Sequence, residues 1–231
     1  MDYTPTRRPK RRHKKKTAQT VTKVILFLLG VVLGILLCIL QKKIYIGSKS
    51  KANCYLQTTT TERLKALNNA KIPEWVDRQF IAVDGSSRNG TELGGMNDIV
   101  IHYIGNPGTT AQQNRDYFAN PDSDVSAHFV IGLDGEIIQC IPLNEMSAAS
   151  NWRNRDTISI EVCHPDESGK FTEATYKSLV RLTAWLMNAS MLDTTHIIRH
   201  HDITGKDCPL YFVEHEDAWT QFLEDVKNCE P

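Results

Sequence analysis

A stretch of 17 residues without a charged side chain, Val24–Leu40, most strongly limits how this chain can fold. Its length is close to the roughly 17 to 25 residues that an α-helix needs to cross the hydrocarbon core of a membrane. The run is long for the apolar part of a cleaved signal peptide, and no convincing small-x-small cleavage site follows it. We therefore predict an uncleaved transmembrane signal anchor over residues 24–40.

Charge is distributed unevenly along the chain. Residues 1–51 contain 13 Lys and Arg against one acidic residue, whereas residues 52–231 contain 14 basic and 26 acidic residues. The basic block Arg7–Lys16 precedes the apolar run, so the positive-inside rule places the N-terminus in the cytoplasm. A basic tail could bind nucleic acid, but the apolar run favours the lipid bilayer as partner and no nucleic acid. We expect a single-pass protein of the cell membrane with its remainder outside the cytoplasm.

Four segments follow from this pattern. Residues 1–23 are a basic cytoplasmic tail and 24–40 the anchor. Residues 41–71 are polar, include a cluster of threonines and read as an extracytoplasmic stalk that is partly helical around Glu62–Asn69. Residues 72–231 are about 160 in number, enough for one domain with its own core.

Within that domain, strand-like and helix-like periodicities alternate, which favours an α/β or α+β sheet covered by helices. The predicted strands are short, rich in β-branched residues and bounded by Gly, Pro or Asp: 98–105, 126–133, 136–142 and 157–164. The predicted helices are 109–120, 172–190 and 216–228. The second helix is the clearest, because its apolar residues recur every three to four positions and Thr172 is suited to its N-cap.

The segment "IIRHHDITGKDCP", residues 197–209, concentrates side chains that bind metals. His200 and Cys208 are separated by a stretch in which Gly205 permits a tight return, so both donors could reach one metal ion. A catalytic zinc site needs three protein ligands and one open position. His102 is the best third candidate because it interrupts an apolar strand, although a histidine there could also be a buried structural residue.

Four motifs in order carry a resemblance to a known family. The chain from about Ile72 onward resembles the zinc-dependent type-2 N-acetylmuramoyl-L-alanine amidases, a superfamily that includes phage lysozyme-like amidases and peptidoglycan recognition proteins. This resemblance implies a mixed central β-sheet flanked by helices and hydrolysis of the amide between muramic acid and L-alanine in peptidoglycan. The motifs are "DIVIHYIGNPGTTAQQNRDYF", "VSAHFVIGLDGEIIQCIP", "NRDTISIEVCHP" and "RHHDITGKDCP".

The resemblance also implies roles for five residues. His102, His200 and Cys208 fall on the family's zinc ligands, and the reaction is attack by a zinc-bound water. Glu161 lies in the strand that carries the family's catalytic glutamate, where it would transfer protons. An unpaired carboxylate in such an apolar strand would be costly, which also suggests a role or a salt bridge. Lys206 falls on the family's catalytic lysine and would stabilise the developing oxyanion.

Several neighbours keep more than one interpretation. His201 is assigned to packing or to support of a ligand. Asp202 could hold a ligand histidine, hold the loop or simply form a turn. His128 could line the cleft or support the sheet. In some relatives a tyrosine precedes this histidine, but the residue here is Ala127, so Glu161 would act without that help.

The loop Asn151–Asn154 could contact sugar or peptide, or be solvated. Tyr103 and Asn106 could border the cleft. Cys140 and Cys163 lie on strands that could be neighbours, so they could form a disulfide or be free buried thiols.

Two further functions remain open at this point. A non-enzymatic peptidoglycan-binding domain on the same fold is the main alternative, although the presence of Cys208 counts against it. A thiol hydrolase with Cys208 as nucleophile and His200 or His201 as base is the other. The sequence predicts neither the oligomeric state nor the type of stem peptide.

Overall fold

The computed structural model describes residues 29, 32–37, 39–41 and 58–231. The basic tail 1–23, residues 24–28, 30–31 and 38 of the predicted anchor, and residues 42–57 lie outside this description. The described residues of the apolar run are helical, and their large apolar side chains are each about half exposed, between 49% and 60%. No helix within the described residues is both long enough and apolar enough to span a bilayer.

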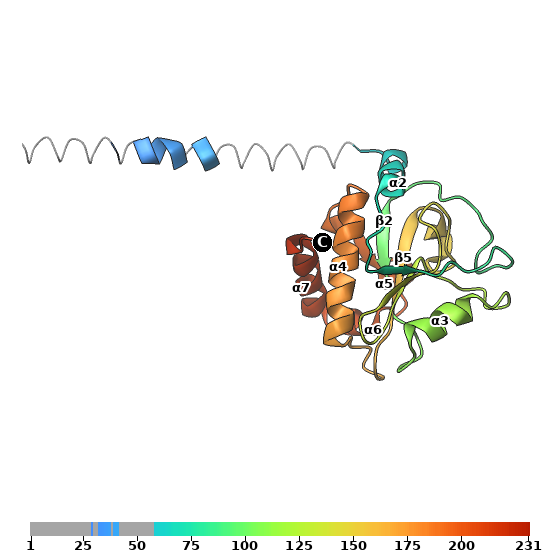
Figure 1. The fold of residues 1–231 in the computed structure, drawn as a ribbon. Coiled ribbons are helices and arrows are strands. Elements are labelled where there is room, and N and C mark those ends of the chain that lie inside the picture. Colours follow the sequence, from blue (N-terminus) through green and yellow to red (C-terminus); the bar gives the residue numbers. More distant parts are fainter. Residues whose placement is uncertain (1–28, 30–31, 38, 42–57) are drawn as a thin grey trace, which may run out of the picture. The chain divides into compact units, whose positions relative to one another are not determined.

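The chain divides into two units, 1–56 and 57–231, and the second contains a six-stranded sheet (Figure 1). The strand order is β1-β4-β3-β5-β2-β6. Only the β3–β4 pair is antiparallel, so β3, β5, β2 and β6 run parallel to one another. The strands are β1 Val76–Arg78, β2 Asp98–Ile101, β3 Phe129–Ile131, β4 Ile137–Gln139, β5 Thr157–Val162 and β6 Ile197–Arg199.

Helices cover both faces of this sheet (Figure 1). The helices are α2 Thr60–Asn69, α3 Ala111–Phe118, α4 Glu173–Ala189, α5 His200–Thr204, α6 Leu210–Glu214 and α7 Glu216–Asn228, with 3₁₀ turns η1 Asn151–Arg155 and η2 Thr194–His196. Strand side chains alternate between faces, so Ile99, Ile101 and Ile160 pack in the larger core with α4 and α7. Val130 and Ile138 point the other way, into a smaller core with α3. The predicted α/β fold with a central sheet flanked by helices is therefore confirmed.

The helix starts follow capping chemistry that the sequence contains. Thr172 caps α4 by accepting a hydrogen bond from the backbone N–H of Thr175. Thr110 and Gln113 form a capping box at the start of α3, in which each side chain accepts from the other residue's backbone. Both helices consequently begin within two residues of the predicted positions.

Part of the segment expected to be a stalk belongs to the second unit. Thr59 and Glu62 form a capping box that starts α2, and Leu67 of this helix is fully buried in the larger core. Residues 58–71 therefore contribute to the core instead of standing apart from the domain.

The two cysteines whose state the sequence left open are free thiols. Cys140 and Cys163 are both buried in the smaller core, and burial raises the pKa of each thiol to about 12. They therefore act as small apolar residues in that core.

Candidate metal centre and active-site cleft

The ends of three parallel strands bring the candidate residues together. His102 follows the last residue of β2, Glu161 lies near the end of β5, and His200 begins α5 directly after β6. Ile101 is in register with Ile160 of β5 and with Arg199 of β6. The three polar side chains therefore lie together at the carboxyl ends of these strands, which is where ligand sites of parallel sheets form.

A tight loop returns the chain from His200 to Cys208. Gly205 has φ of 74°, in the left-handed region that glycine adopts freely, and its N–H donates to the carbonyl of His201 at 2.7 Å. His201 closes the loop, because its backbone N–H donates to the carbonyl of Cys208 and its Nδ1 bonds the carbonyl of Lys206, both at 2.8 Å. These two hydrogen bonds make His201 a support of the loop between the two candidate ligands; the cluster of donor atoms does not include it.

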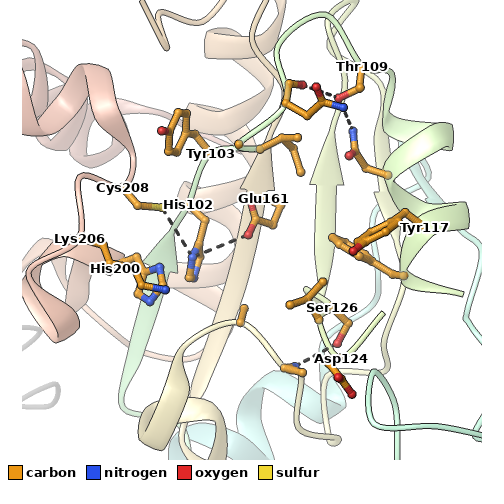
Figure 2. Close-up of a pocket in the computed structure, with 18 of the residues that line it drawn as sticks. His102, Tyr103, Thr109, Tyr117, Asp124, Ser126, Glu161, His200, Lys206 and Cys208 are labelled. Atoms are coloured by element: carbon orange, nitrogen blue, oxygen red, sulfur yellow. Dashed lines mark hydrogen bonds and ion pairs between the residues drawn. The ribbon is translucent and has the colours of Figure 1, made fainter. Parts of the chain in front are cut away.

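Three donor atoms converge at this point (Figure 2). The ligand atoms of His102, His200 and Cys208 all lie within 4.8 Å of one another. Sγ of Cys208 is 3.9 Å from Nδ1 of His102, and the two imidazole rings are 4.5 Å apart between centroids. The side chains come from positions up to 106 residues apart in sequence.

This donor set fits a zinc ion. Two imidazole nitrogens and a thiolate are among zinc's preferred ligands, and around a tetrahedral zinc two such atoms stand roughly 3.3–3.6 Å apart. The observed separation of sulfur and nitrogen, 3.9 Å, is only slightly wider. Burial, together with the neighbouring His200 and Lys206, holds the pKa of His102 well below its usual value, so its ring is neutral and able to bind a metal.

The outer ring nitrogen of each histidine has an oxygen partner. Nε2 of His102 is 3.2 Å from Oγ of Ser150, and Nε2 of His200 is 3.1 Å from Oδ1 of Asn151. Both partners lie at the start of η1, immediately before β5. No sequence pattern indicates Ser150, since it is a single serine in a polar loop. For Asn151 the sequence suggests a contact with substrate and not with a histidine.

Glu161 lies beside the cluster, with Oε1 3.8 Å from Nδ1 of His102 (Figure 2). Its Oε2 is buried and has no hydrogen-bond partner within the described part of the chain. Burial raises the pKa of Glu161 to about 8, so this carboxyl can bind and release a proton near neutral pH.

Cys208 and Lys206 complete the cluster. Cys208 is 9% exposed, and burial and then the nearby Glu161 raise the pKa of its thiol, against the opposing effects of the backbone N–H of Tyr103 and of Lys206. A bound cation is therefore needed to favour the thiolate here. Lys206 is exposed at the edge of the same cleft.

The cluster opens into a cleft with a volume of about 970 Å³. Its opposite wall includes Tyr117 of α3, Asp124 and Ser126 (Figure 2). Phe118 and Val125 also line the cleft. Tyr117 is 55% exposed. The remaining lining includes Tyr103, Asn106, Asn151 and Asn154, so these predicted neighbours of the cleft do border it.

Asp202 and His128 have structural contacts. Asp202 accepts hydrogen bonds from the backbone and side chain of Arg199 and so holds the start of α5. His128 is fully buried outside the cleft lining. Its Nδ1 accepts from the backbone N–H of Ser159 at 3.0 Å, and its Nε2 donates to the carbonyl of Glu145 at 2.9 Å. His128 therefore supports the sheet.

The middle of the 151–154 loop turns away from the cleft. Arg153 forms ion pairs with Asp98 and Asp156, and Trp152 is 64% exposed with its ring beside that guanidinium. Neither residue lines the cleft, so only the two asparagines of this loop are placed to meet a substrate there.

Comparison with known proteins yields one family. The sequence profile described as N-acetylmuramoyl-L-alanine amidase (Amidase_2) matches residues 94–210. The chain is 31% identical over 170 residues to N-acetylmuramoyl-L-alanine amidase CwlL of Bacillus licheniformis, covering 66% of this chain and 47% of that protein. It is also 31% identical over 169 residues to amidase BlyA of Bacillus subtilis, covering 64% and 46%. The chain thus spans about half the length of these relatives.

Solved structures share the fold. The catalytic domain of XlyA is 27% identical, with a TM-score of 0.57 over 65% of this chain and 98% of that one. PlyL, at 22% identity, has a TM-score of 0.60 over 68% of this chain and 99% of that one, a likeness of fold. The matched profile includes every residue of the metal cluster and Glu161. The chain belongs to the type-2 N-acetylmuramoyl-L-alanine amidase family.

Proposed function

We propose that this protein is a zinc-dependent hydrolase that cleaves the amide bond between N-acetylmuramic acid and L-alanine in peptidoglycan. Family membership supports the reaction, because the relatives described above are named N-acetylmuramoyl-L-alanine amidases. The observation that carries the proposal is the convergence of His102, His200 and Cys208 within 4.8 Å, beside Glu161, in an open cleft.

The metal would be held by the two imidazoles and the thiolate. Zinc bound there would act as a Lewis acid and supply an activated water as nucleophile. The neutral state of His102 suits this role. The raised pKa of the Cys208 thiol argues against the thiol-hydrolase alternative, since a nucleophilic cysteine needs a lowered pKa.

Glu161 would carry the protons. Its carboxylate takes a proton from the attacking water and delivers it to the nitrogen of the L-alanine leaving group. A pKa of about 8 suits both steps near neutral pH. Among the described residues its buried Oε2 has no hydrogen-bond partner, so no bond to the protein holds this oxygen in place.

Lys206 would stabilise negative charge on the carbonyl oxygen of the scissile amide. It is exposed, borders the cleft and acts electrostatically on both ligand histidines, whose pKa values it helps to lower. A cation at this position favours the tetrahedral intermediate more than the neutral amide.

A direct assay tests this function. The full chain, purified in detergent and loaded with zinc, is incubated with peptidoglycan, and newly freed L-alanine amino termini are quantified. Release that stops with a strong chelator and returns with zinc supports the amidase. Absence of release at full zinc occupancy, with both lysine-type and diaminopimelate-type peptidoglycan, would instead favour a non-enzymatic peptidoglycan-binding domain.

We also propose that the apolar run Val24–Leu40 anchors the protein in the cell membrane, with the catalytic unit outside the cytoplasm. The uncharged run and the preceding basic block Arg7–Lys16 support this orientation. Intact spheroplasts provide the test. Protease added outside should degrade the catalytic unit while the chain fractionates with membranes, and deletion of residues 24–40 should release it. A chain that remains soluble or protected from protease would contradict the anchor.

A further inference from the structure

Both candidate metal-binding histidines are held by consecutive residues of one segment. Oγ of Ser150 lies 3.2 Å from Nε2 of His102, and Oδ1 of Asn151 lies 3.1 Å from Nε2 of His200. We propose that Ser150 and Asn151 act as a histidine clamp, two positioning residues that set the tautomer and orientation of both ligand rings. The inference rests on the proposed metal site.

The hydrogen-bond chemistry determines which nitrogen faces the metal. Oδ1 of Asn151 can only accept, so Nε2 of His200 carries the proton and its Nδ1 keeps a free lone pair. The hydroxyl of Ser150 accepts from Nε2 of His102 when Nδ1 of that ring binds a cation. This Nδ1 already faces Sγ of Cys208 at 3.9 Å. Oxygen partners of this kind also raise the basicity of the ligand nitrogen.

The clamp is itself rigidly supported. Oδ1 of Asn154 accepts from the backbone N–H of Ala149 at 3.1 Å and of Ser150 at 2.6 Å. Ser150 is fully buried. Two residues after Asn151, the guanidinium of Arg153 pairs with Asp98 and Asp156. Since these bonds fix the backbone on both sides, the clamp can constrain the rings instead of following them.

The identity of Asn151 meets two requirements at once. Its φ is 55°, in the left-handed region that asparagine tolerates better than most non-glycine residues. Its side chain must also present an acceptor to His200. Glycine satisfies only the backbone requirement, and aspartate satisfies both. Replacing Asn151 by glycine or by aspartate therefore distinguishes the effect of losing the acceptor from the effect of backbone strain.

The test measures metal binding by the full chain in detergent. Zn²⁺ affinity is obtained by competition with a chromophoric chelator, and Co²⁺ reports ligand geometry through its visible absorption. We expect Asn151→Gly and Ser150→Ala each to weaken Zn²⁺ binding about 10- to 100-fold and to alter the Co²⁺ spectrum. Asn151→Asp should retain the affinity and spectrum of the wild type.

Asn188→Ala, at an exposed position of α4, serves as the control and should leave both measurements unchanged. Circular dichroism and thermal unfolding of the apo-proteins show whether each variant is folded. The clamp is refuted if folded Asn151→Gly and Ser150→Ala both bind Zn²⁺ within twofold of wild type, or if Asn151→Asp behaves like Asn151→Gly. If wild type binds no Zn²⁺, or if His102→Ala binds it equally well, the proposed metal site itself fails.

Discussion

Oε1 of Glu161 lies 3.8 Å from Nδ1 of His102, between the neighbouring strands β5 and β2. Glu161 is an ionisable group at a position where its second oxygen, Oε2, has no partner. Such a carboxyl does not serve stability, because burying it without a hydrogen bond costs free energy. The arrangement supports the proposed role of Glu161 in proton transfer, and the opposite effects of one substitution on activity and on stability test it.

Glu161→Gln should lower kcat about 10²- to 10⁴-fold, because the amide cannot transfer protons. Zinc affinity should be retained, and the free energy of unfolding should be unchanged or higher, since a buried unpaired carboxyl is removed. Amine release and chemical denaturation measure the two effects. Glu173→Gln, at an exposed salt bridge with Lys177, is the control. A kcat within tenfold of wild type would show that another group moves the proton.

Cys208→Ser should abolish stoichiometric zinc binding and with it activity, because a hydroxyl is a much poorer zinc ligand than a thiolate. Equilibrium dialysis with metal analysis measures the binding. Cys229→Ser, at a partly exposed free cysteine, should bind zinc like the wild type. Activity of the wild type that persists in a strong chelator but disappears in Cys208→Ser would support a thiol nucleophile instead.

Lys206→Met should lower kcat by about 10²- to 10³-fold, the usual cost of losing one oxyanion-stabilising group. Zinc affinity should not fall, because the lysine's positive charge disfavours further positive charge near the ligand histidines. Parallel kinetic and metal-binding measurements distinguish these effects. Lys170→Met is the matched control, because the ammonium group of Lys170 lies over the ring of Tyr211 and outside the cleft. Equal losses of zinc and activity would make Lys206 a structural residue.

His128 should make the protein less stable in acid. Burial lowers its pKa from 6.5 to about 4, so the unfolded chain binds a proton at pH values where the folded protein does not. The stability that His128 contributes by staying neutral in the folded protein is fully present above pH 6.5 and is lost as the pH falls toward 4. Between pH 7.5 and pH 5, protonation of His128 in the unfolded chain should lower the free energy of unfolding by about 2 kcal/mol.

Urea unfolding of the metal-free protein at these two pH values measures that loss. In His128→Gln the difference between them should shrink by about the same 2 kcal/mol, whatever the variant's absolute stability. His215→Gln, at an exposed position, should keep the wild-type difference. An unchanged difference in His128→Gln would assign the acid sensitivity to other groups.

Leu67→Ala should destabilise the catalytic unit by about 2–5 kcal/mol, because it removes a buried side chain and leaves a cavity. Leu67 is fully buried in the larger core, although it precedes the domain boundary predicted at residue 72. Lys65→Ala, exposed on the same helix, should change stability by less than about 0.5 kcal/mol. Thermal unfolding of both variants tests whether α2 is part of the folded unit, and equal effects would contradict it.

The sequence predicted those elements whose local pattern is strong. The four predicted strands and three predicted helices are present. They could be predicted because runs of β-branched residues and the amphipathic pattern of a helix such as Glu173–Ala189 are recognisable in the sequence alone. Strands β1 and β6 were missed. Two of the three residues of β1 are charged, and β6 passes directly into α5 without a Gly, Pro or Asp between them. The helix of α2 was anticipated only in part, and nothing local indicates that Leu67 reaches the core.

The cluster itself was anticipated from the motifs, whereas its geometry was not. The order of the motifs identified the five residues, but the distances among them depend on the placement of β6 beside β2. The partners of the outer nitrogens, Ser150 and Asn151, come from a loop without a sequence signal. Their contribution depends on tertiary contacts, which are invisible in a one-dimensional pattern.

The parallel pairing of β2 with β6 has a consequence for biosynthesis. β2 begins at Asp98, whereas its neighbour β6 begins at Ile197 and is followed by the loop that ends at Cys208. Until residues 200–208 have emerged from the ribosome, the growing chain contains only one of the three metal donors, His102. The three donors can therefore come together only after the ribosome has passed Cys208, so the metal centre forms after translation of the sheet strands β1 to β6 and not during it.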